Sequence, residues 1–108
     1  MAQLDAVIEQ RIKVAVAAVS RFGRVVRAYL FGSQVEGMAD RWSDIHVAVF
    51  VEGVESWDMH QRARVAAQVQ KTAGDDVEIH FIPAKALQER DDASFAAWVL
   101  THGVEVRI

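Results

Sequence analysis

Two apolar runs joined by a glycine-containing segment constrain the fold of this chain more than any other feature. The first run, Val25 to Phe31, is rich in β-branched and aromatic residues and leads directly into Gly32-Ser33. The second run, Ile45 to Val51, follows Asp44, which lies eleven positions after Ser33. Both runs predict β-strands. The second run is almost wholly apolar, so we expect it at the centre of a sheet with both faces covered.

Helical patterns alternate with these strands. Residues 4–22 carry an apolar stripe at helical spacing, formed by Leu4, Ile8, Ile12, Ala15 and Val19. We expect Ser56 to cap a second helix that runs to about Thr72 and ends at Gly74. Its predicted buried side carries Met59, Ala63, Ala66 and Ala67. A third helix is predicted over Phe95 to Thr101.

Two shorter strands complete the predicted order, at Val77 to Ile82 and at Val104 to Ile108. Alternation of helices and strands predicts an α/β or α+β arrangement, in which helices pack against one sheet. The 108 residues contain no internal repeat and no linker-like stretch, so we expect a single domain over residues 1–108.

Composition excludes several classes of protein. The formal net charge of −3 argues against a surface built for nucleic acid, because such binding needs clustered lysine and arginine. The chain has no cysteine, which excludes a thiolate metal site or a cysteine nucleophile and is consistent with a cytoplasmic protein. No apolar segment approaches the roughly 20 residues that a membrane span needs, and no secretory signal is visible.

Strand alternation places the ionisable side chains. Asp44 and His46 project from the same face of their strand, and Asp76, Glu78 and His80 share a face of the later one. If the two strands pair, then Asp44, His46 and Glu78 converge. Two carboxylates about 4 Å apart repel by about 4 kcal/mol at an effective dielectric constant of about 20, and a divalent cation relieves that repulsion. His80 is expected to be a partly exposed strand residue.

The spaced motif resembles a known family. Leu30-Phe31-Gly32-Ser33, the ten-residue interval and Ser43-Asp44-Ile45-His46-Val47 are similar to the signature of the minimal nucleotidyltransferases of the DNA polymerase β superfamily. The resemblance covers nearly the whole chain and implies a small mixed sheet with helices packed against it. It also implies that Gly32 and Ser33 contact nucleotide phosphates, that Asp44 binds metal, and that Glu78 is the third carboxylate, with Asp76 as the alternative.

Two residues depart from the family pattern. His46 stands where a second metal-binding aspartate is expected, and imidazole suits Zn, Mn or Co better than Mg. Glu36 stands where many relatives carry an arginine near the phosphates. His46 is therefore a metal ligand beside Asp44 and Glu78, a proton carrier, or a neutral hydrogen-bonded residue in a site that has lost its metal.

Two functional hypotheses follow from the resemblance. In the first, the chain uses Mg²⁺ or Mn²⁺ to transfer a nucleoside monophosphate, most simply AMP from ATP, to a hydroxyl acceptor, which a partner protein could carry. Asp44 and Glu78 would be its catalytic residues. In the second, the domain has lost catalysis and acts as a binding partner, either as the antitoxin of a helical HEPN-type toxin or as a subunit of a two-component complex. A protein partner or a homodimer suits both hypotheses.

Overall fold

The computed structural model describes residues 5–32, 35 and 44–108. Ser33 and Glu36 lie outside these residues. The elements are α1 (Ala6–Ser20), β1 (Val25–Phe31), β2 (Ile45–Val51), η1 (Val54–Ser56), α3 (Met59–Ala73), β3 (Val77–Pro83), η2 (Ala84–Leu87), α4 (Phe95–His102) and β4 (Val104–Val106), where η marks a short 3-10 turn.

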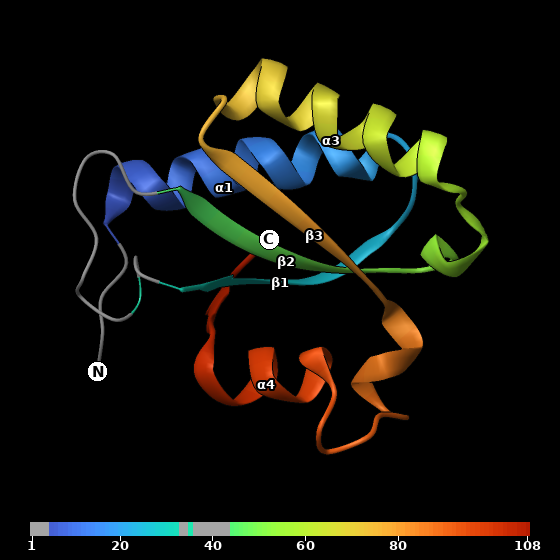
Figure 1. Cartoon of the computed structure of the whole chain (residues 1–108). Helices are drawn as coiled ribbons and strands as arrows, with labels where there is room; N and C mark the ends of the chain where they lie inside the picture. Colours follow the sequence, from blue (N-terminus) through green and yellow to red (C-terminus); the bar gives the residue numbers. More distant parts are fainter. Residues whose placement is uncertain (1–4, 33–34, 36–43) are drawn as a thin grey trace.

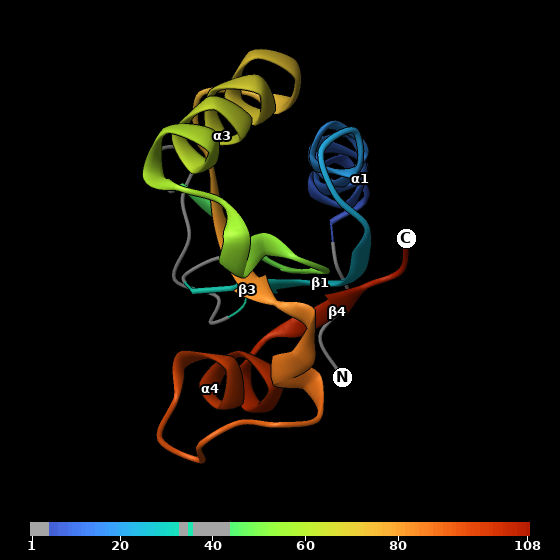
Figure 2. The same ribbon diagram turned by 90° about the vertical axis from the view of Figure 1, so that its right-hand side faces the viewer.

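The four strands form one mixed sheet in the order β3-β2-β1-β4. Strand β1 runs antiparallel to both β2 and β4, whereas β2 and β3 are parallel. Helices α1 and α3 lie side by side on one face of the sheet and α4 covers the other face (Figures 1 and 2). The predicted fold class, an α/β (α+β) domain with a small mixed sheet and packed helices, is confirmed.

Strand β2 lies between β1 and β3, as its apolar sequence predicted. Every residue of β2 except His46 is buried. Its odd-numbered residues pack in the core beneath α1 and α3, together with side chains such as Ile12 and Val65. Its even-numbered residues Ala48 and Phe50 pack in a second core on the α4 face. His46 therefore also faces α4, at the end of β2 where the strand begins.

The α1 stripe behaves as predicted, because Ile12, Ala15 and Val19 are all fully buried. Helix α3 differs in two respects. Its N-cap is Asp58, whose carboxylate accepts a hydrogen bond of 2.8 Å from the backbone N–H of Gln61, so the expectation of a Ser56 cap was wrong. Ser56 instead belongs to η1, where its hydroxyl donates to the carbonyl of Gly53.

The buried face of α3 is also displaced from the predicted one. Val65, Val69 and Ala73 are buried, whereas Met59 is 86% exposed. Alanine fits either face of a helix, but burying a valine removes more apolar area from water, so the two valines set the rotation of α3. Within the part of the chain that the structure describes, no helix is both long and apolar enough to cross a bilayer.

Candidate active site

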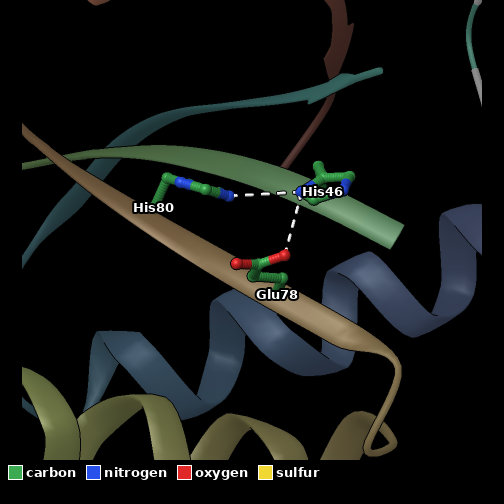
Figure 3. A group of neighbouring side chains, drawn as sticks. All are labelled: His46, Glu78 and His80. Carbon is green, nitrogen blue, oxygen red and sulfur yellow. Dashed lines mark hydrogen bonds and ion pairs between the residues drawn. The ribbon is translucent and has the colours of Figure 1, made fainter. Parts of the chain in front are cut away.

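The parallel pairing of β2 and β3 places His46 directly opposite Glu78. The Nδ1 atom of His46 lies 3.2 Å from the Oε2 atom of Glu78 (Figure 3). The two side chains are 31% and 52% exposed, so the pair is partly shielded yet open to a ligand. The predicted convergence of these two residues depended on the pairing of the strands, and the structure contains that pairing.

His80 lies two residues after Glu78 on the same face of β3, and its Nε2 atom is 3.3 Å from Nδ1 of His46. Each of the three residues offers a ligand atom, and these atoms lie within 4.8 Å of one another. We call His46, Glu78 and His80 the His-Glu-His cluster. Burial lowers the pKa of His80 below its usual value, and the nearby negative charge of Glu78 opposes that effect only in part. His80 is accordingly a neutral ring near pH 7.

The glycine turn lies next to this cluster. Phe31, the last residue of β1, pairs with His46, and Gly32 follows with a φ of +85°. A side chain at Gly32 would place its Cβ 3.3 Å from the Cδ2 atom of His46. The turn continues as the backbone N–H of Val35 donates a 3.0 Å hydrogen bond to the carbonyl of Gly32. A glycine in the left-handed region thus brings the backbone close to the His46 ring, without a side chain between them.

A family model for the polymerase beta nucleotidyltransferase domain matches residues 13–103 of this chain. The chain belongs to this nucleotidyltransferase family. No curated protein matches it. The resemblance inferred from the Gly-Ser turn and the spaced acidic motif is therefore confirmed.

Two solved structures show how far the likeness extends. A crystal structure of a toxin-antitoxin with AMP-PNP contains a chain that is 25% identical, with a TM-score of 0.65 over 92% of this chain and 72% of that one. A putative nucleotidyltransferase from Sulfolobus solfataricus is 19% identical, with a TM-score of 0.51 over 81% of this chain and 82% of that one. The second likeness concerns the fold alone.

The nucleotidyltransferase signature also includes Asp44, which lies one residue before β2 and is exposed. Among the described residues, the group of converging ligand atoms contains His46, Glu78 and His80, and Asp44 is not a member. The assignment of Asp44 as a metal ligand stays a prediction, as do the phosphate contacts of Gly32 and Ser33.

The two alternatives for the third carboxylate occupy different surroundings. Asp76 precedes β3, and its carboxylate forms an ion pair with the guanidinium of Arg11 on α1. Hydrogen bonding to Arg11 lowers the pKa of Asp76 below its usual value. Glu78 is the carboxylate that faces His46. An acid committed to a structural ion pair is less available to a ligand, so this geometry favours Glu78 for the role.

An aromatic wall borders the His-Glu-His cluster on the α4 side. The ring of Phe31 lies 5.4 Å from that of His46 and 5.1 Å from that of His80, measured between centroids. It also makes edge contacts with Phe95 and Trp98, at 5.4 and 5.7 Å. Phe95 and Trp98 are 45% and 38% exposed and stack on each other. The cluster is thus shielded from water on one side by rings contributed by β1 and α4.

The contact between His46 and Glu78 was expected from the sequence. The positions of His80 and of the aromatic wall beside these two residues were not. The signal for His80 was present, because it lies in phase with Glu78 along one strand. What was missing was the register of β2 against β3, which sets the imidazole of His80 beside that of His46. In the aromatic wall, Phe31 contacts Phe95 and Trp98, which lie more than sixty positions later in the chain. No local sequence pattern predicts a contact over that separation.

Proposed function

We propose that this nucleotidyltransferase-family domain binds ATP at the Gly32-Ser33 turn and transfers its adenylyl group to a hydroxyl on a partner protein. The observation that carries the proposal is the pairing of His46 with Glu78 next to the Gly32 turn. Backbone N–H groups in a turn that contains a left-handed residue form a concave site for anions, which suits a nucleotide's phosphates.

The residues would act as follows. The acceptor's hydroxyl oxygen attacks the α-phosphorus of ATP, so that a new O–P bond forms and the bond to the β-phosphate oxygen breaks, releasing pyrophosphate. The carboxylate of Glu78, which is half exposed, accepts the hydroxyl proton. Asp44, His46 and Glu78 would hold the divalent cation, which, when bound, offsets the negative charge of the phosphates and orients them.

Thermal stabilisation tests the nucleotide part of this proposal. ATP with Mg²⁺ or Mn²⁺ should raise the melting temperature of the wild type, because a ligand at one hundred times its dissociation constant stabilises the native state by about 2.7 kcal/mol. Asp44→Asn should weaken the effect. Glu105→Gln, which removes an exposed carboxylate on β4, is the control and should leave it unchanged. Absence of stabilisation with either metal would contradict the proposal.

A transfer assay tests the chemistry. α-Labelled ATP should yield a labelled protein when the chain is incubated with the partner that co-purifies with it. Glu78→Gln should reduce labelling by at least a hundredfold, within the range of general acid–base contributions. If ATP stabilises both the wild type and Glu78→Gln but neither labels the partner, the proposed ATP binding is supported and the proposed transfer is refuted.

A second function is favoured by the toxin-antitoxin structure, whose chain aligns with 92% of this one. In this alternative the domain is an antitoxin that neutralises a helical, HEPN-type toxin by contact alone. Neutralisation in cells would then survive Asp44→Asn and Glu78→Gln. If both substitutions abolish neutralisation while the two proteins still co-purify, the contact-only version fails and transfer is required.

A further inference from the structure

We propose that the His-Glu-His cluster is a transition-metal site that binds Zn²⁺ in preference to Mg²⁺, with both imidazoles and the Glu78 carboxylate as ligands. The proposal builds on the site described above, but it requires neither ATP binding nor transfer. It differs from the metal set expected from the sequence, because it includes His80 and does not need Asp44.

The chemistry of the donors is the first argument. Two imidazole nitrogens and one carboxylate oxygen form the ligand set of several catalytic zinc sites, which leave a fourth position for water or substrate. Mg²⁺ instead prefers oxygen ligands and dehydrates reluctantly. Among divalent first-row metals, the affinity of such a site generally rises from Mn²⁺ to a maximum at Cu²⁺ and is lower again at Zn²⁺, and imidazole ligands suit Zn²⁺ whereas Mg²⁺ suits oxygen ligands.

The distances between donor atoms are the second argument. Two ligands of a tetrahedral zinc ion, each about 2.05 Å from the metal, lie about 3.3 Å apart. Nδ1 of His46 is 3.2 Å from Oε2 of Glu78 and 3.3 Å from Nε2 of His80. Adjacent ligands of an octahedral Mg²⁺ lie about 2.9 Å apart. The two separations from Nδ1 of His46 therefore match a tetrahedral ion, and all three ligand atoms lie within 4.8 Å of one another (Figure 3).

The third argument is that a single hydrogen bond serves only one of the two neighbours of Nδ1 of His46. Nδ1 of His46 carries either a proton or a lone pair. With a proton, Nδ1 can donate a hydrogen bond to Glu78, but the same proton is then poorly placed for a hydrogen bond to the second neighbour, Nε2 of His80. With a lone pair it can accept from His80, but then it faces the carboxylate of Glu78 lone pair to lone pair. A cation accepts all three lone pairs at once.

The surroundings are the fourth argument. Phe31 packs against both imidazoles, so the rings are held by contacts as well as by their strands. The two strands that carry the ligands are paired along their whole length, from Ile45 with Val77 to Val51 with Pro83. Donor atoms fixed on a rigid sheet lose little freedom on metal binding, which increases affinity. The exposed side of Glu78 leaves a path for the ion.

Metal titration of the full chain without nucleotide tests the inference. After treatment with a chelator, the wild type should bind one Zn²⁺ by calorimetry and show a higher melting temperature with ZnCl₂. MgCl₂ at the same concentration should produce no such shift. Co²⁺ should give the visible absorption of a low-coordinate site, and this signal should disappear on addition of Zn²⁺.

Two matched substitutions locate the ion. His80→Gln should weaken Zn²⁺ binding at least tenfold, whereas His60→Gln, which removes an exposed histidine on α3, should leave it unchanged. Glu78→Gln provides a second variant if His80→Gln does not fold. Equal losses in the two histidine variants, or a wild type that binds Zn²⁺ no better than Mg²⁺, would overturn the inference. ATP stabilisation that persists without Zn²⁺ would leave the proposed function standing even then.

Discussion

At the scale of single residues, the Arg11–Asp76 ion pair ties α1 to the segment that connects α3 and β3. Arg11 also donates a 3.0 Å hydrogen bond from Nε to the carbonyl of Ala73, the last residue of α3. Gly74 makes this possible, because a Cβ at that position would collide with the Arg11 guanidinium. One arginine thus satisfies a helix-terminal carbonyl and a carboxylate together.

The pair predicts a pH-dependent loss of stability in Asp76→Asn. The pKa of Asp76 is lowered in the folded state by Arg11, so its contribution is fully present above the unfolded value of about 3.9 and is lost as the pH falls through the folded value. Both side chains are partly exposed, so we expect a cost of about 0.5–1 kcal/mol at pH 7. Urea unfolding at pH 7 and near pH 2.5 should show this difference shrinking in acid. Asp75→Asn is the control, and a difference that is constant with pH would contradict the assignment.

Gly32 supplies a second prediction at this scale. Gly32→Ala should destabilise the fold by about 1–2 kcal/mol, because an alanine pays for a left-handed backbone conformation. It should also shift the NMR signals of the His46 ring, since the new Cβ would lie 3.3 Å from Cδ2.

Gly53→Ala is the matched control for that experiment. Gly53 has a similar φ of +76°, but a Cβ there would meet nothing within 4 Å. The two variants should therefore lose similar stability in chemical denaturation, while only Gly32→Ala perturbs His46. Unchanged His46 signals in Gly32→Ala would show that the turn and the cluster are independent.

At the scale of elements, the sequence specified β1 and β2 to the residue, because both are mainly apolar runs, each with one internal polar residue (Arg27 or His46), bounded by polar or glycine residues. It could not fix where α3 begins. Ser56 and Asp58 are both good capping residues, and the structure decides between them because Ser56 belongs to the preceding 3-10 turn, Val54–Ser56. The same limit applies to the site. Alternation put Glu78 and His80 on one face, but the contact of both side chains with His46 depends on the register between two strands that are far apart in the chain.

The α3 cap can be tested directly. Asp58→Ala should destabilise the protein by about 1 kcal/mol, because it removes the acceptor for the N–H of Gln61 and a negative charge from the start of the helix. Ser56→Ala should cost less, since that hydroxyl donates to an exposed turn carbonyl. Guanidinium unfolding of both variants measures the two losses of stability. A larger loss in Ser56→Ala than in Asp58→Ala would show that Ser56 is the N-cap.

At the scale of the whole molecule, the sheet separates two cores with different tasks. The larger core, between the sheet and the α1–α3 layer, contains Val65 and includes none of the three cluster residues. The smaller core, beneath α4, contains Val99 together with Phe31, whose ring packs against His46 and His80. The layer formed by α4 should therefore influence the cluster, although α4 contributes none of its three ligand atoms.

Val65→Ala and Val99→Ala form a matched pair for this idea, because both valines are fully buried and lie in different cores. Each should lose about 1.5–2.5 kcal/mol of unfolding free energy, from the buried carbon atoms removed and the cavity left behind. Only Val99→Ala should also shift the ring NMR signals of His46 and His80, because only that cavity lets Phe31 move. Equal shifts in both variants would mean that the histidines report general loosening of the sheet. Absence of a shift in Val99→Ala would mean that β2 and β3 alone fix the cluster and that α4 merely covers it.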